Sequence, residues 1–220
     1  MRIVRSTLPD GTYWRYGYDA KGQVTAAAKH RLPGEVLHGM GHTYAFDEIG
    51  NRDEVTRIAT TGMAAVTTDY TPNSVNQYAA IANPATLDVV GETDAGADVE
   101  INTVDALRQG SWFAGTLGAG ETGSDWLAVT VDAEAPGGSP SSSAGGNLFL
   151  PAASVSPEHD ADGNLLFDGR WDYTWDAENR LIGMTTSVTA QTAGVPAITI
   201  EHTYDGDSRR IATVTTAGSE

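Results

Sequence analysis

Aromatic and polar residues alternate most clearly between residues 162 and 184 of the chain. Trp171, Tyr173 and Trp175 fall on one side of an extended backbone, and the residues between them are polar. This period of two is typical of a β-strand with one buried face. Asp168-Gly169 stands just before the strand and predicts a tight hairpin turn, which would be of type I′ if both central residues took positive φ. The segment is therefore predicted to be a β-meander.

A short motif that is part of this meander recurs along the chain. An aromatic residue or His ends a predicted strand, Asp follows directly, and Gly or Asn usually stands three residues after the Asp, although the last copy departs from this order at Gly206 and Ser208. Asp can accept backbone N–H bonds across such a turn, and Gly or Asn supplies the residue with positive φ. Such hairpins cannot bury a face alone, so we expect them to pack side by side in a curled antiparallel sheet. The copies begin at Tyr18-Asp19, Phe46-Asp47, His159-Asp160, Trp175-Asp176 and Tyr204-Asp205.

Two segments near the first copies lack a clear strand pattern. Residues 33–42 are rich in Gly and are predicted to form a loop. Residues 69–83 are predicted to form a short connector, with one helical turn around residues 75–78.

The pattern changes between residues 84 and 151. The run from Pro136 to Gly146 is rich in Gly, Ser and Pro and predicts a flexible loop. Several strands in about 65 residues, with a turn roughly every 8–12 residues, favour a small antiparallel sandwich of immunoglobulin-like type. The strands are expected at residues 87–91, 97–102, 111–117 and 126–131. We therefore predict repeats at residues 1–83 and 152–220 that flank an inserted β-sandwich at residues 84–151.

Composition and charge argue against several classes of partner and site. The formal net charge of −16 over 220 residues argues against nucleic acid or an anionic membrane as a partner, because phosphate binding needs clustered Lys and Arg. The chain has no Cys, which excludes disulfides, zinc–thiolate sites and thiol nucleophiles. No apolar run approaches the roughly 20 residues that a membrane-spanning helix needs, so we expect no membrane insertion.

The two ends of the chain have no distinctive signal. The first residues, MRIVRSTLPDGTYW, contain arginines but lack the apolar segment of a secretory signal peptide. The last residues, TVTTAGSE, follow strand-like sequence without a closing element. Both ends are therefore expected to be cut from a longer polypeptide.

One acidic segment is spaced like the start of a calcium loop. Asp160, Asp162 and Asn164 stand at its first, third and fifth positions. However, Leu165 stands where that loop needs Gly, and Trp171 stands where it needs Glu. A structural turn is therefore favoured.

A pair of histidines is the other candidate for metal binding. His38 and His42 stand four apart, as two ligands on one face of a helix do. Gly39 and Gly41 argue against a helix, and no third ligand follows nearby. The sequence therefore predicts no metal and no cofactor.

Residues for catalysis or ligand binding are equally sparse. No G-x-S-x-G nucleophile elbow is present. Gly118 to Gly123 has the glycine spacing of a dinucleotide fingerprint, but a strand rather than a helix is predicted to follow, which favours a loop. Trp112 and Trp126 could stack on sugar rings, but a core position is favoured for each. We predict no catalytic residue, and the sequence assigns no ligand-binding residue.

The stretch from Tyr173 to Leu181, YTWDAENRL, closely resembles the signature of the RHS-repeat, or YD-repeat, family of bacteria. Residues 160–165 and 70–78 resemble further signatures of that family, and the resemblance covers about residues 12–83 and 158–215. It implies a long β-sheet that spirals into a hollow shell, which animal teneurins share. In the family the shell belongs to cell-surface proteins or to secretion-linked toxins, where it encloses a C-terminal toxic domain.

These observations predict a non-enzymatic structural segment of a bacterial RHS-repeat protein at the cell surface or outside the cell. Its expected partners are the rest of a longer RHS polypeptide or an enclosed C-terminal toxin domain. The alternative is a module that binds a carbohydrate or a cell-surface protein through the inserted sandwich at residues 84–151.

Overall fold

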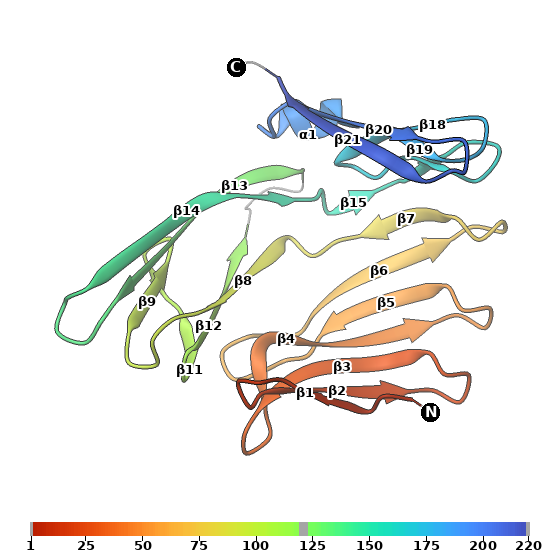
Figure 1. Ribbon diagram of the computed structural model, residues 1–220. Helices are drawn as coiled ribbons and strands as arrows, with labels where there is room; N and C mark the ends of the chain where they lie inside the picture. Colours follow the sequence, from red (N-terminus) through yellow and green to blue (C-terminus); the bar gives the residue numbers. More distant parts are fainter. Residues whose placement is uncertain (1, 119–122, 219–220) are drawn as a thin grey trace. The chain divides into compact units, whose positions relative to one another are not determined.

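Antiparallel strands make up nearly all of the regular secondary structure of the computed structural model, which describes residues 2–118 and 123–218 (Figure 1). Within these residues the one helix is α1 (Val188–Thr192). The predicted all-β antiparallel fold is therefore confirmed. The strands group into two units by their contacts. Among the described residues, the first unit holds residues 2–69, 86–118 and 128–148, and the second holds residues 70–85, 123–127 and 149–218.

The first unit contains a sheet in which strands follow one another in chain order, each antiparallel to the next (Figure 1). The strand register shifts, as at a β-bulge, just before two of the turns. The shift lies at Tyr18 at the end of β2 and at Phe46 at the end of β4. The repeat motif therefore places its aromatic residue at the bulge. The strands are β1 (Arg5–Thr7), β2 (Tyr13–Tyr18), β3 (Val24–Arg31), β4 (Glu35–Phe46), β5 (Arg52–Arg57) and β6 (Val66–Pro72), whose last residues belong to the second unit.

The loop predicted at residues 33–42 is wrong, because β4 begins at Glu35 and runs through this segment. Its glycines serve close packing instead of a loop. A Cβ atom on Gly39, whose φ is +72°, would lie 2.8 Å from a Val90 methyl, and one on Gly41 would lie 3.0 Å from a Val36 methyl. Gly is therefore needed here because neighbouring strands approach this part of β4 closely.

The inserted segment forms two small sheets within the first unit. One has the order β10-β9-β13-β14 and the other has the order β11-β12-β8. Val99, Ile101, Phe113 and Val129 form a buried core to which both sheets contribute. The immunoglobulin-like relationship stays a prediction. The strands are β8 (Thr86–Glu92), β9 (Asp98–Ile101), β10 (Val104–Asp105), β11 (Leu107–Gln109), β12 (Trp112–Gly118), β13 (Asp125–Glu134) and β14 (Ser141–Leu150).

The flexible loop predicted from Pro136 to Gly146 is wrong over most of its length, because β14 begins at Ser141. Small residues have little intrinsic preference for a strand, so composition predicted a loop. Pairing with β13 at the end of the sheet overrides that preference. The connecting turn closes with a bond from the Ala135 N–H to the Pro140 carbonyl of 3.0 Å.

The second unit contains the meander that the aromatic pattern predicted. Its six-stranded sheet has the order β16-β17-β18-β19-β20-β21. Along β18 the residues Trp171, Tyr173 and Trp175 are half-buried, and the two residues between them are exposed. The period of two therefore identified the packed face correctly. The strands of this unit are β7 (Tyr78–Ala82) with its partner β15 (Ser154–Val155), and β16 (Glu158–His159), β17 (Leu165–Phe167), β18 (Trp171–Trp175), β19 (Leu181–Thr186), β20 (Ile198–Tyr204) and β21 (Arg210–Ala217).

The hairpin before β18 differs from the predicted type. The Asp168 N–H donates to the Trp171 carbonyl at 3.3 Å, which closes a tight turn. Gly169 has φ of +96°, whereas Arg170 is not among the residues with positive φ. A single positive φ at the first central position is the geometry of a type II′ turn, so the type I′ interpretation is wrong.

Candidate functional site

Each turn of the repeat is organised by the side chain of its first residue. In the turn from Asp176 to Arg180, the Asp176 Oδ1 atom accepts bonds from the backbone N–H groups of Glu178 at 2.9 Å and Arg180 at 3.0 Å. The backbone closes through a bond of 3.0 Å from the Asp176 N–H to the Arg180 carbonyl. Asn179 has φ of +58°, as its predicted place requires. The carboxylate therefore satisfies the backbone donors that a turn leaves without strand partners.

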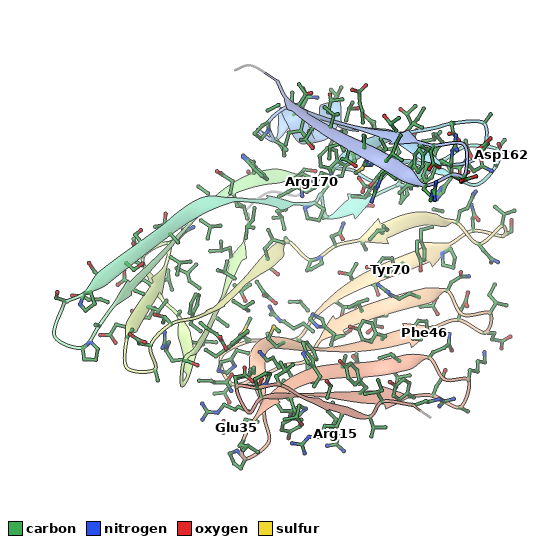
Figure 2. The ribbon with its side chains drawn as sticks, in the orientation of Figure 1. Arg15, Glu35, Phe46, Tyr70, Asp162 and Arg170 are labelled. Atoms are coloured by element: carbon green, nitrogen blue, oxygen red, sulfur yellow. The ribbon has the colours of Figure 1, made fainter. Side chains whose placement is uncertain are left out.

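The same geometry is present at every predicted copy. In each, the first residue donates its N–H to the carbonyl of the fifth residue and accepts backbone N–H bonds with its carboxylate. Figure 2 shows Phe46 at the end of β4, beside one of these turns, and Asp162 within the turn that precedes β17. The first residues are Asp19, Asp47, Asp160 and Asp205, and the residues with positive φ are Gly22, Gly50, Gly163 and Ser208.

The sequence analysis missed one copy of this turn. Asn73 stands where the others have Asp, and its Oδ1 atom accepts the N–H groups of Val75 and Gln77 at 3.0 Å each. Asn76 takes the positive φ of +63°. The helical turn predicted around residues 75–78 is therefore wrong. The spacing Asn-x-x-Asn after a strand was the available signal, because an Asn amide oxygen accepts the same bonds as a carboxylate.

Several of these turns lower the pKa of the carboxyl group at their first residue. The backbone N–H of Arg180 bonds to Asp176 and lowers the pKa of that carboxyl below its usual value. The backbone N–H of Arg209 does the same for the pKa of Asp205, and the side-chain amide of Asn164 does so for the pKa of Asp160. Because each acceptor is used by the turn, these acidic residues are turn-forming groups and not general acids.

The aromatic residue before the turn contacts an earlier strand of its own sheet. The Tyr204 hydroxyl donates to the Leu181 carbonyl at 2.9 Å, and the Trp175 indole N–H donates to the Leu165 carbonyl at 2.8 Å. The Tyr18 hydroxyl donates at 2.7 Å to the carbonyl of Ile3, which lies just before β1. The repeated aromatic residues therefore join successive hairpins and do not form a free platform for a ligand.

A buried ion pair joins the first sheet to the inserted segment. Arg57 on β5 is 3% exposed and contacts Asp88 on β8. Arg57 also donates to the Ala64 carbonyl at 2.7 Å and to the Thr116 hydroxyl at 3.3 Å. The guanidinium group is therefore fully engaged in positioning the insert, and little of its hydrogen-bonding capacity is left for a substrate.

Trp112 belongs to the same junction. It is buried, its indole N–H donates to the His38 carbonyl at 3.3 Å, and the Lys29 ammonium lies 4.6 Å from the centre of its ring. Gln109 accepts the His38 N–H at 2.7 Å through its side-chain oxygen. Trp112 thus takes the core position that the sequence favoured and is not accessible to a sugar.

The two histidines that the sequence singled out lie on β4. His38 is buried, and its Nδ1 atom lies 2.7 Å from the Thr60 hydroxyl oxygen. Burial lowers the pKa of His38, and it also lowers the pKa of the half-buried His42. No cluster of three or more potential metal-ligating His, Asp or Glu residues occurs within residues 2–118 and 123–218. The structure therefore assigns His38 to packing at the junction.

The remaining candidates are the segment from Asp160 to Asn164, the predicted glycine loop and Trp126. The segment from Asp160 to Asn164 is one of the turns described above. Residues 119–122 of the predicted glycine loop lie outside the described residues. Trp126, at the start of β13, is half-buried, and a Cβ atom on Gly194 would lie 3.6 Å from it.

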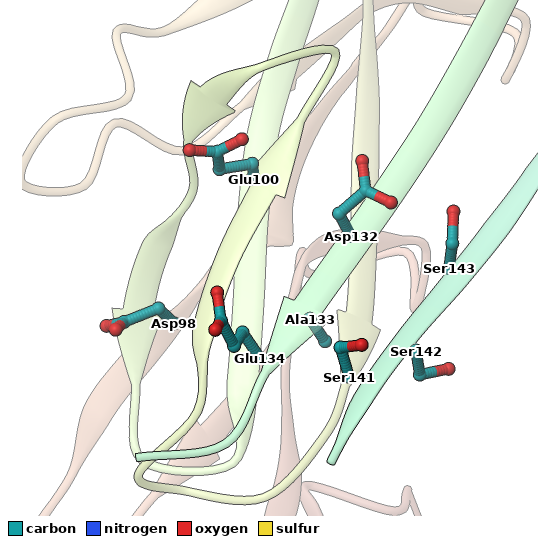
Figure 3. A pocket seen from close by; sticks show the side chains of 8 residues that line it. All are labelled: Asp98, Glu100, Asp132, Ala133, Glu134, Ser141, Ser142 and Ser143. Carbon is teal, nitrogen blue, oxygen red and sulfur yellow. The ribbon is translucent and has the colours of Figure 1, made fainter. Parts of the chain in front are cut away.

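A hollow on the inserted sheets is lined mainly by acidic and hydroxyl side chains. It has a volume of about 250 Å³ and is lined by carboxylates from β9 and β13 and by serines from β14 (Figure 3). Glu100 lies opposite Asp132, and Asp98 lies opposite Glu134 in the antiparallel register. Like charges that face each other across strands are destabilising. This group was not predicted, because the alternation of acidic residues in each strand does not show that the two strands pair in this register.

Comparison with known proteins finds a family match for the first copy of the repeat. Residues 2–29 match the family profile described as RHS Repeat. This segment is similar to an RHS repeat. The matched segment contains the whole of the Tyr18-Asp19 copy, with β1 and β2 before its turn and most of β3 after it. The RHS resemblance predicted from the turn motif is therefore confirmed.

Solved structures similar to this chain share little sequence with it. A crystal structure of TcdB2-TccC3-Cdc42 matches with 13% identity and a TM-score of 0.37, over 96% of this chain and 10% of that chain. A crystal structure of TcdB2-TccC3 matches with 10% identity and a TM-score of 0.21, over 93% of this chain and 13% of that chain. The chain thus spans a small part of each. No curated protein matches it.

Proposed function

We propose that this chain is a wall segment of a larger bacterial RHS-repeat shell and that its role is structural rather than enzymatic. The observation that carries the proposal is the recurrent five-residue turn, which joins successive antiparallel strands through the same hydrogen bonds in both units. In each turn the carboxylate, the aromatic residue and the residue with positive φ all stabilise the hairpin. Repeating this turn extends the sheet by one hairpin each time.

The edge strand β21 supports the proposal. All residues of β21 are exposed, and Ile211 and Val214 are 63% and 54% exposed. An exposed edge strand that contains apolar residues is suited to pairing with a further strand. We infer that this further strand belongs to the next repeat of a longer RHS polypeptide.

The proposed partner and location of the protein follow from its place in a shell. A closed wall would separate an enclosed toxin domain from its surroundings, and such proteins act outside the producing cell or at its surface. No helix within the described residues is long and apolar enough to cross a membrane.

The test is a structure, by electron cryo-microscopy, of the longest polypeptide that the gene encodes around this chain. We expect β21 to pair with an antiparallel strand of the following residues, and a second repeat sheet to close around a cavity. A structure in which β21 faces solvent would contradict the proposal.

A further inference from the structure

The strand β14 is an unprotected sheet edge. It is 10 residues long, it ends the order β10-β9-β13-β14, and residues 141–148 are exposed. Residues 141–146 contain no charged residue and no proline, which are the groups that usually prevent an edge from pairing. At the opposite end of the same sheet, β10 has only 2 residues. The backbone donors and acceptors along residues 141–146 are therefore available to an extended peptide.

The outer face beside this edge is strongly acidic. Asp132 and Glu134 lie on β13, the neighbour of β14, and face Glu100 and Asp98 on β9. Only the small side chains of Ser141, Ser142 and Ser143 complete the hollow on the side of β14 (Figure 3). A strand added to β14 would lie about 10 Å from β13, because neighbouring strands are about 4.8 Å apart. A Lys or Arg side chain that extends over β14 and a β13 carboxylate that leans toward it can together span that distance, and the serines do not block them.

The inner face of the same strand is apolar. A second hollow, of about 240 Å³, lies beneath β14 and is lined by Val89, Val129, Ala144 and Leu148 among others. Val89 packs against the core of the two inserted sheets, and Val129 is part of that core. Side chains of an added strand alternate between the two faces. Those on this face would therefore meet an apolar surface.

We propose that β14 binds an extended peptide in which basic and apolar residues alternate. The peptide pairs its backbone with residues 141–146, its Lys or Arg side chains neutralise the carboxylates of β13 that face those of β9, and its apolar side chains fill the hollow beneath β14. This assignment accounts for the like-charged pairs, whose repulsion is relieved when the cationic side chains bind.

Charge selects this occupant over a second copy of the chain. Pairing two β14 edges would bring two acidic faces together on molecules that each carry a net charge of −16. Repulsion of that kind opposes self-association. A basic peptide meets attraction at the same edge.

The test uses the full chain and a capped peptide of about seven residues with alternating Lys and Val. Binding is measured by calorimetry at about 0.05 M and about 0.15 M salt, and the site is mapped by amide hydrogen exchange. We expect weaker binding at the higher salt and protection of the amides of residues 141–146. A peptide with Glu in place of Lys should not bind. A peptide with alternate backbone nitrogens methylated keeps its charge but cannot pair fully, and it should bind about ten-fold more weakly or worse.

Two matched variants test the charge. Asp132→Asn with Glu134→Gln removes two carboxylates from the hollow and should weaken binding about ten-fold. Glu48→Gln with Asp162→Asn removes two exposed carboxylates from turns and should leave binding unchanged. Circular dichroism confirms that each variant is folded before binding is measured.

Three results would overturn the proposal. They are no binding at millimolar peptide, equal binding of the methylated peptide, and equal weakening by the two pairs of substitutions. The last two would show a general attraction between opposite charges without strand pairing.

Discussion

At the scale of single residues, the repeat depends on a carboxylate or amide oxygen at the first position of the turn and on a positive φ at the fourth. Asn73 shows that the charge itself is dispensable, because its amide oxygen accepts two backbone N–H groups as Asp176 does. Ser208 shows that neither Gly nor Asn is required at the fourth position, since it takes φ of +60°. The hydrogen-bond acceptor is therefore the more restrictive requirement.

Substitution of Asp176 separates these contributions. We expect Asp176→Ala to lower the melting temperature clearly, because it leaves the N–H groups of Glu178 and Arg180 without their acceptor. Asp176→Asn should lower it less, since the amide oxygen replaces the carboxylate as at Asn73. Thermal unfolding followed by circular dichroism measures both. An equal loss in the two variants would show that the charge, and not the acceptor, supports the turn.

Among the glycines of the second unit, Gly169 is the one where an added side chain should lower stability most. Its φ is +96°, and a Cβ atom there would lie 3.1 Å from both methyl groups of Val155. Gly169→Val should lower the free energy of unfolding by well over about 1 kcal/mol, because β-branched residues resist positive φ. Urea denaturation measures the change.

Gly206→Val is the matched control for that measurement. A Cβ atom on Gly206 meets nothing within 4 Å, and its φ is not positive. The control should therefore change stability little. If Gly169→Val were as mild as the control, the assigned turn geometry would be incorrect.

At the scale of elements, the inserted sheets are fixed to the first repeat sheet by polar groups buried between β5 and β8. Arg57→Met should lower the free energy of unfolding by about 2–3 kcal/mol, because it leaves Asp88 without its partner. The value is at the low end for a buried pair because the Asp88 side chain is 24% exposed. Urea denaturation of the variant checks it.

Two further variants control that result. Arg209→Met removes an ion pair whose arginine is 73% exposed and should cost less than about 1 kcal/mol. Arg57→Met combined with Asp88→Asn should recover part of the loss, since neither charge is then left unpaired. If the double variant were less stable than Arg57→Met alone, the ion pair between Arg57 and Asp88 would not be what holds the inserted sheets to the first repeat sheet.

Patterns within single elements were readable from the sequence, whereas effects between elements were not. The alternation at Trp171, Tyr173 and Trp175 identified the packed face of β18, because burial on one face imposes a period of two. The strand nature of residues 35–42 and 141–146 was missed because it depends on neighbours. Gly39 is required by the approach of Val90, and β14 is held by pairing with β13. Local composition contains neither fact.

The candidate sites also differ in whether local sequence could predict them. The turn residues follow from local sequence chemistry and were predicted, apart from Asn73. The junction around Arg57 and Asp88 joins residues 31 positions apart. The acidic hollow needs the register of β9 with β13, so neither site can be derived from a motif.

At the scale of the whole molecule, stability should fall in weak acid. Burial lowers the pKa of His38 and of His42 below the usual 6.5. The unfolded chain therefore binds more protons than the folded chain as pH drops below about 6.5. The stabilising contribution is complete above about pH 6.5 and is lost as pH falls toward the folded-state pKa values.

Urea denaturation between about pH 7.5 and about pH 5.5 checks this sign. The wild-type chain should lose stability over that range, and the double variant His38→Asn, His42→Gln should lose less. A double variant whose stability declines as steeply as that of the wild type would place the titrating groups elsewhere.

The central claim is that this chain is part of a continuous RHS wall, and β21 is the place where continuity can be measured. Residue-resolved amide hydrogen exchange is compared between residues 1–220 alone and the longest polypeptide that the gene encodes. We predict that the amides of residues 210–217 that face away from β20 exchange fast in the isolated chain and are protected in the longer polypeptide. Fast exchange in both would contradict the claim.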